Sequence, residues 1–140
     1  MDVLRELNEV SRYIEEHITD DIDINKLAEI TKQSSDSFSR LFSYMVGMTA
    51  NEYIRRRKLS LAVNDLQNSD MKIIDIAMKY GWNSSDAFAK AFVNQHGTTP
   101  TNARVKSAQL KYIHLFPLKL ILEEQKKWIL KLLTLRALKF

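Results

Sequence analysis

The sequence predicts an all-α protein in which two helix-turn-helix units are joined by a long linker helix. Two observations carry this prediction. Apolar residues recur at spacings of three and four through the first hundred residues, where no alternating strand pattern is found. The segment SSDSFSRLF at 34–42 also recurs fifty residues later as SSDAFAKAF at 84–92. Self-similarity at a fixed spacing indicates a repeated structural unit.

The repeat extends beyond this segment at both ends. The matched pairs are Gly47 with Gly97, Thr49 with Thr99, Leu27 with Ile76, Ala28 with Ala77, and Lys32 with Gly81. The upstream pairs are separated by 49 residues and not by fifty, so one additional residue is expected in the second turn. A left-handed backbone at Lys32 would add strain of about 1 kcal/mol, since that conformation suits glycine.

The first unit is expected at about residues 1–48. It begins with an amphipathic helix from Asp2 to about His17. Asp23 then caps a short helix from 24 to about 30, because its carboxylate can accept from free backbone N–H groups. Ser34 caps a third helix in the same way, and Gly47 ends it.

The linker helix is expected at about 49–68 and the second unit at about 69–107. Thr49 and Glu52 are spaced as a capping box that starts the linker helix. A helix N-terminus is expected at Asp70-Met71, and Ser84 caps the helix that repeats the third one. Pro100 suits the first turn of a last short helix.

Charge is distributed unevenly along the chain. Residues 1–33 hold nine acidic against four basic residues, a net charge of −5, and the remaining residues hold 17 basic against eight acidic, a net charge of +9. The basic part contains both repeated helices, so a polyanion is a natural partner. On charge alone, a soluble protein with a basic isoelectric point is an equally good interpretation.

Enzymatic chemistry has little support in this composition. The sequence has no cysteine, its three histidines lack metal-ligand spacing, and its three glycines form no phosphate-binding loop. We therefore expect no catalytic residue, no metal and no cofactor. His96 precedes Gly97 and is interpreted as a helix C-terminal residue favoured by the helix dipole.

The N-terminus carries charges where a signal peptide would be apolar, and no uncharged run of 18 apolar residues occurs. We therefore expect a cytoplasmic protein without a membrane partner.

Two motifs allow a family resemblance to be stated. The segment from Ile73 to Pro100 follows the pattern IxxIAxxxGWxSxxxFxKxFxxxxGxTP, and residues 53–62 read YIRRRKLSLA. With these motifs and an order of seven helices, residues 3–107 resemble the DNA-binding domain of the AraC/XylS family of bacterial transcription regulators. Lys32 departs from the family pattern, as does Ala103, where the family usually has an aromatic residue.

The resemblance implies a bipartite, homeodomain-like domain that binds double-stranded promoter DNA. It further implies an effect on transcription, as an activator that often contacts RNA polymerase. A linker helix of about 18 residues is roughly 27 Å long, near the ~34 Å repeat of DNA, so two recognition helices could enter successive major grooves. The alternative is a helical protein-interaction module that does not bind DNA.

Eight base-reading residues follow from the resemblance. They are Ser35, Asp36, Ser39 and Arg40 in the first unit, and Ser85, Asp86, Ala89 and Lys90 in the second. Helical spacing independently places them opposite the Phe stripes. Arg40 can bond guanine O6 and N7 together. Asp36 and Asp86 either accept from cytosine N4 or complement the helix dipole, and we favour the dipole.

Phosphate contacts are predicted at Arg55, Thr99 and Arg104, with helix N-termini as further anchors. Arg55 belongs to the run RRRK at 55–58, which points around the whole helix. Some of the four side chains must therefore contact their own protein, and one or two can reach phosphate. A solvated helix face is the alternative for each of these residues.

The tail from 108 to 140 is rich in Leu and Lys and is expected to form a helix that is apolar over more than half its circumference. It could pack on the domain, pair with a copy of itself or lie on a membrane surface. Its 33 residues are too few for an effector domain, so no small-molecule effector is expected. Our hypothesis is that it is the truncated remnant of one.

Overall fold

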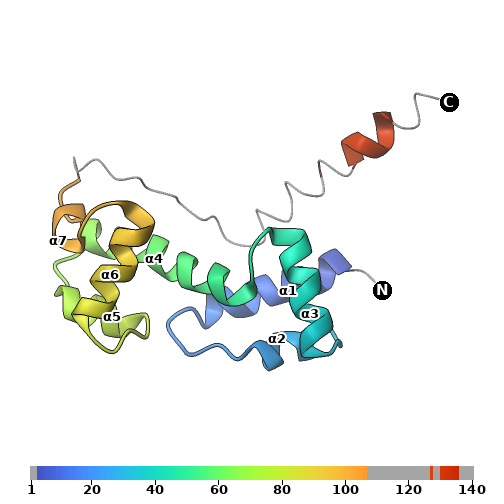
Figure 1. Cartoon of the computed structure of the whole chain (residues 1–140), viewed down its shortest axis with the longest axis horizontal. Coiled ribbons are helices and arrows are strands. Elements are labelled where there is room, and N and C mark those ends of the chain that lie inside the picture. Colours follow the sequence, from blue (N-terminus) through green and yellow to red (C-terminus); the bar gives the residue numbers. More distant parts are fainter. Residues whose placement is uncertain (1–2, 107–126, 128–129, 136–140) are drawn as a thin grey trace. The chain divides into compact units, whose positions relative to one another are not determined.

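The computed structural model describes residues 3–106, 127 and 130–135. Residues 3–106 form seven α-helices and no β-strand, which confirms the predicted all-α class (Figure 1). The helices are α1 (Val3–Glu16), α2 (Ile24–Ile30), α3 (Ser35–Val46), α4 (Ala50–Asn68), α5 (Ile73–Lys79), α6 (Ser85–His96) and α7 (Pro100–Ala103). They fall into two compact units, with α1 to α3 in the first and α5 to α7 in the second.

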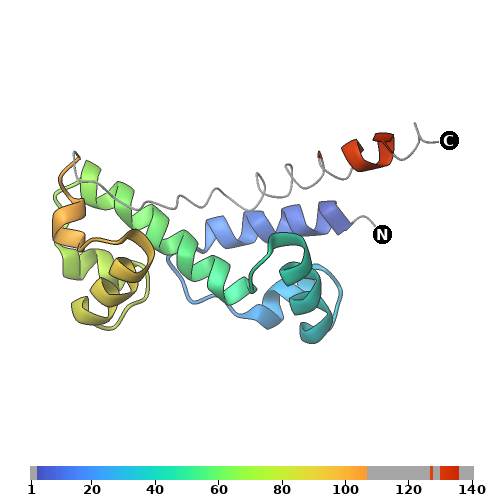
Figure 2. The same ribbon diagram turned by 45° about the horizontal axis from the view of Figure 1, so that its top comes forward.

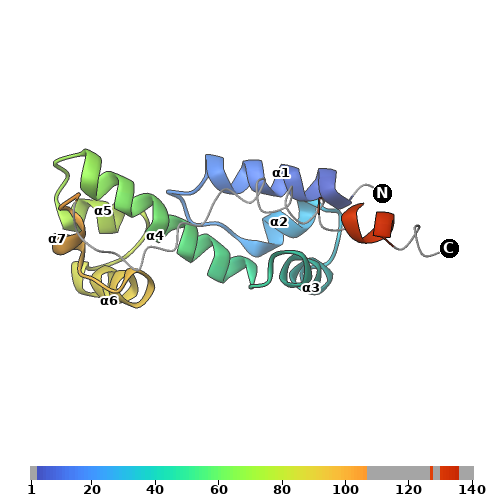
Figure 3. The same ribbon diagram turned by 90° about the horizontal axis from the view of Figure 1, so that it is seen from above.

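In the first unit, α2 contacts both α1 and α3 (Figure 3). The apolar stripe predicted for α1 is buried, with Leu7, Val10 and Ile14 fully shielded from solvent. Phe38 and Phe42 of α3 are also fully buried, and their ring centroids lie 5.8 Å apart. The opposite face of α3 is thereby left to the solvent.

In the second unit, α4 supplies one side of the core and α5 to α7 supply the other (Figures 1 and 2). Apolar side chains from all four helices form one buried cluster: Leu59, Ala62, Val63, Leu66, Ile76, Ala77, Tyr80, Phe88, Phe92 and Ala103. Residues 51–68 of the predicted linker helix therefore pack as part of the second unit.

The predicted serine and glycine caps are present at both recognition helices. Ser34 Oγ accepts from the Ser37 N–H at 3.2 Å, and Ser84 Oγ accepts from the Ala87 N–H at 3.1 Å. Gly47 and Gly97 end the two helices in the left-handed conformation, with φ of 85° and 75°. The duplication seen in the amino-acid sequence is therefore also present in the backbone structure of the two helices.

The turns that precede α3 and α6 have equivalent residues 49 positions apart, whereas the helices themselves repeat at 50. Lys32 and Gly81 have φ of 55° and 91°, and Lys32 is the non-glycine residue with positive φ in residues 3–106. The Gln33 N–H donates to Ala28 O at 3.1 Å, and the Trp82 N–H donates to Ala77 O at 2.9 Å. Both bonds span five residues, as in a Schellman helix ending. Lys32 therefore has the left-handed backbone for which a strain of about 1 kcal/mol is expected.

The N-terminus predicted at Asp70-Met71 is wrong. Helix α5 begins at Ile73, and its N-cap Lys72 makes no side-chain capping bond. Ser69 explains the delay, because its hydroxyl accepts from the Met71 N–H at 3.3 Å and donates to Asp65 O at 2.6 Å. These bonds hold the loop outside the helix.

The predicted tail helix lies mostly outside the described residues. Residues 130–135 are helical, and Leu130, Leu132, Leu133 and Leu135 are exposed. Within the part of the chain that the structure describes, no helix is long and apolar enough to span a membrane.

Candidate nucleic-acid interface

Helix α3 presents a polar face opposite Phe38 and Phe42. Asp36, Ser39 and Arg40 are exposed there. Ser35 is half-buried, and its hydroxyl donates to Asn25 Oδ1 on α2. Three of the four base-reading residues predicted for the first unit are therefore accessible, and Ser35 also helps to fix α3 against α2.

Helix α6 presents the equivalent face in the second unit. Asp86 and Lys90 are exposed, while Ser85 and Ala89 are half-buried. An open groove runs past this face, and its lining comes from α5, α6, α7 and the residue before α7: Ile73, Ile74, Ser85, Asp86, Ala89, Thr99, Pro100 and Thr101. The structure thus brings three predicted base readers together with Thr99, a predicted phosphate contact.

Asp36 and Asp86 lie in the first turns of their helices. Free backbone N–H groups at a helix N-terminus favour a nearby negative charge. Both carboxylates are also exposed on the recognition face. Their position is thus compatible with both interpretations. The carboxylates can interact favourably with the helix dipole, which is the interpretation that we favour, or accept a hydrogen bond from cytosine N4.

The basic run at 55–58 divides as its spacing predicts. Arg56 Nη2 pairs with Glu52 Oε1 at 2.7 Å, and Arg57 is buried with 7% of its surface exposed. Lys58 Nζ donates to Asp20 O at 3.1 Å. Burial lowers the Lys58 pKa, and the Asp21 and Asp20 carboxylates oppose that shift. Arg55 is exposed and remains the member of the run available to a phosphate.

The two other predicted phosphate contacts have structural roles. Thr99 Oγ caps α7 by accepting from the Asn102 N–H at 3.2 Å, and its hydroxyl can still donate. Arg104 donates to Leu66 O at 3.3 Å, to Ser69 O at 2.8 Å and to Met71 O. Its guanidinium satisfies carbonyls around the end of α4, so the structure does not support Arg104 as a phosphate contact.

The dipole interpretation of His96 is wrong. The residue does end α6, but its side chain is fully buried and its ring centroid lies 4.4 Å from that of Phe92. Burial lowers the His96 pKa, against the opposing effect of the bond to Leu59. The imidazole is therefore neutral, and its Nε2–H donates to Leu59 O at 3.1 Å because a carbonyl can only accept.

Tyr44 and Asn94 are two further exposed residues of α3 and α6 that the sequence reasoning did not single out. They occupy equivalent places in the repeat, fifty residues apart, and each follows the basic residue of its recognition helix by four positions. Residues four apart share a helix face. Both are exposed, Tyr44 to 87%. The four-residue spacing from Arg40 and Lys90 is the signal that could have found them.

Among the described residues, no group of His, Asp and Glu is arranged to hold a metal ion.

Two turn-linked helix pairs, each with an exposed polar helix held over two buried Phe rings, define a helix-turn-helix DNA-binding protein. Sequence comparison agrees, because a family profile described as a helix-turn-helix domain matches residues 27–106. The HTH-type transcriptional activator AarP of Providencia stuartii is 33% identical over 99 residues, which cover 71% of this chain and 73% of AarP. The chain belongs to the AraC family of transcription regulators.

Solved structures support the same assignment. An AraC-type regulator from Chromobacterium violaceum superposes with a TM-score of 0.69 at 25% identity, covering 75% of this chain and 94% of that one. The DNA-binding domain of AdpA, a global transcriptional factor solved in complex with a target DNA, gives a TM-score of 0.66 at 26% identity. That match covers 72% of this chain and 91% of the AdpA domain. The chain is a DNA-binding transcription regulator.

Proposed function

We propose that this protein activates transcription by inserting α3 and α6 into successive major grooves of one promoter site. The observation that carries the proposal is the duplication of the reading element. Both helices have a serine N-cap, a left-handed glycine at the end and two fully buried Phe residues below an exposed polar face. The name of AarP as an activator and the AdpA complex with DNA support it.

The two units read DNA unequally in this proposal. Arg40 bonds guanine O6 and N7, while Ser39 and Ser35 offer hydroxyls and Asp36 flanks them at the helix start. In the second unit, Lys90 offers a single ammonium and Ala89 a methyl group that can touch the thymine methyl. Ser85 and Asp86 complete that face. Since the two faces differ, the bound site is asymmetric.

Phosphate contacts supply most of the affinity in this proposal. Arg55 and Thr99 are the contacts that we retain, and Arg104 is left out because of its internal bonds. Each cation that neutralises a phosphate releases counterions, so binding weakens steeply as the salt concentration rises. Activation would then follow from a contact with RNA polymerase in the cytoplasm. Family membership favours this function over the protein-interaction module.

The site assignment is tested with Arg40→Ala and Arg55→Ala. Binding is measured by fluorescence anisotropy on a duplex selected by the protein from a genomic library, and on a random duplex of equal length. Arg40→Ala should lose about 1–3 kcal/mol on the selected duplex, roughly 5- to 150-fold, with little change on the random one.

Arg55→Ala should weaken binding to both duplexes alike and lower the salt slope by about 1. Equal losses on both duplexes from Arg40→Ala would overturn its role as a base reader.

A further inference from the structure

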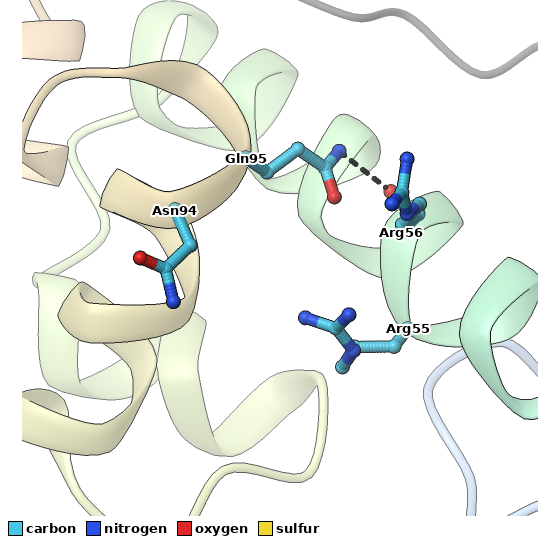
Figure 4. Close-up of a pocket in the computed structure, with 4 residues that line it drawn as sticks. All are labelled: Arg55, Arg56, Asn94 and Gln95. Atoms are coloured by element: carbon cyan, nitrogen blue, oxygen red, sulfur yellow. Dashed lines mark hydrogen bonds between the residues drawn. The ribbon is translucent and has the colours of Figure 1, made fainter.

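We infer that Arg55, Asn94 and Gln95 form a binding site for a single backbone phosphate beside the groove that α6 enters. The inference rests on the proposed function and adds two residues to it. These three side chains and Arg56 line one pocket in the second unit (Figure 4). Among the residues that the structure describes, the lining holds two guanidinium groups, two carboxamides and no carboxylate.

Arg55 supplies the charge of this site. Its neighbours in the basic run are committed elsewhere, with Arg56 paired to Glu52 and Lys58 bonded to Asp20 O. Arg55 is exposed, and Figure 4 shows its guanidinium directed into the space bordered by Asn94 and Gln95. A guanidinium can grip a phosphate through two parallel N–H···O bonds.

Gln95 borders the site and holds α6 against α4. Its Nε2 donates to Arg56 O at 3.0 Å and to Ser60 Oγ at 3.3 Å, which ties the end of α6 to α4. Its Oε1 is buried and has no hydrogen-bond partner. Buried acceptors of this kind are normally satisfied. One N–H of Arg55 can satisfy it and leave the remaining donors of the guanidinium for the phosphate, so Gln95 is a positioning residue.

Asn94 completes the site from the recognition helix. It is exposed on α6, one turn beyond Lys90, and its carboxamide can donate to an anionic oxygen. Contacts to bases come mainly from the N-terminal part of a recognition helix. A residue near the C-terminal end of α6 is therefore placed for the strand that borders the groove. A phosphate fits this combination of one free cation and one neutral donor better than a base edge does.

The experiment uses the full chain and its selected duplex, in which one phosphate at a time is replaced by an uncharged methylphosphonate. For the wild-type protein, the methylphosphonate at one position should weaken binding. For Arg55→Ala, the substitution at that same position should have no effect, so the sensitivity to it is lost. Asn94→Ala should reduce the sensitivity at the same position, weaken binding about 2- to 10-fold and leave the salt slope unchanged, because it removes a neutral donor. Asn64→Ala, a change at an exposed Asn on α4, is the matched control.

Non-additive losses in the Arg55→Ala, Asn94→Ala double variant would support a shared phosphate. The inference is overturned if Asn94→Ala binds like wild type, or if the two variants change sensitivity at different phosphates. A failure of the proposed function would give another result, because the wild-type protein would then bind the selected duplex no more tightly than a random one.

Discussion

At the scale of single residues, His96 shows how a polar side chain near the DNA-binding face serves the core instead. It ends α6, is fully buried, and ties that helix to α4 through the bond from Nε2 to Leu59 O. Burial disfavours its charged form and lowers its pKa. The second unit thus depends on a neutral imidazole.

This burial predicts that the protein loses stability as the pH falls. Below the ordinary histidine pKa of about 6.5, the unfolded chain binds a proton that folded His96 does not. The stabilisation is therefore fully present above that pH and declines below it, by at most about 1.4 kcal/mol per pH unit. Urea unfolding followed by circular dichroism at pH 7.5 and 5.5 measures the decline.

His96→Gln keeps an N–H donor without the titrating ring, so the variant should be less stable at pH 7.5 but should lose less on acidification. An undiminished decline in His96→Gln would show that another group is responsible.

The sequence predicts which residue types face outward, but it does not predict how each side chain is used. It indicates that some of the run at 55–58 must turn inward, because four consecutive residues circle a helix. It does not show that Arg57 is the buried one or that Arg56 pairs with Glu52. The bonds from Arg104 to carbonyls more than 30 positions earlier are equally invisible, since they depend on tertiary packing.

At the scale of elements, the caps were predictable because their chemistry is local. Ser34, Ser84, Gly47 and Gly97 act on backbone groups within a few residues of themselves. The start of α5 was not predictable, because Ser69 and Arg104 together hold the preceding loop in another conformation. Local signals therefore located the recognition helices better than the loop between α4 and α5.

The two turns offer a reciprocal test of backbone strain. Lys32 and Gly81 both have positive φ, and a Cβ at Gly81 would meet no atom closer than Lys58 Nζ at 3.8 Å. Lys32→Gly should stabilise the protein by about 0.5 kcal/mol, because relief of about 1 kcal/mol of strain exceeds the added entropy of the unfolded chain. Gly81→Ala should destabilise it by about 0.5–1 kcal/mol for the converse reason.

Urea unfolding of both variants at one pH measures these changes. Destabilisation by Lys32→Gly would show that the Lys32 side chain makes contacts worth more than the strain it imposes.

At the scale of the whole molecule, the chain divides into two compact units. The sequence suggested a separate linker helix, whereas α4 contributes Leu59, Ala62, Val63 and Leu66 to the core of the second unit. Periodicity could not reveal this, because a helix that packs against neighbours on several sides has no single apolar stripe.

The most direct test of two-groove binding is a dimethyl sulfate and hydroxyl-radical footprint on the selected duplex. We expect two protected major-groove segments on one face of the DNA, with centres about 10–10.5 base pairs apart. Arg40→Ala should weaken protection in one segment, and Lys90→Ala should weaken it in the other. A single protected segment, or loss of protection in the same segment by both variants, would contradict the account.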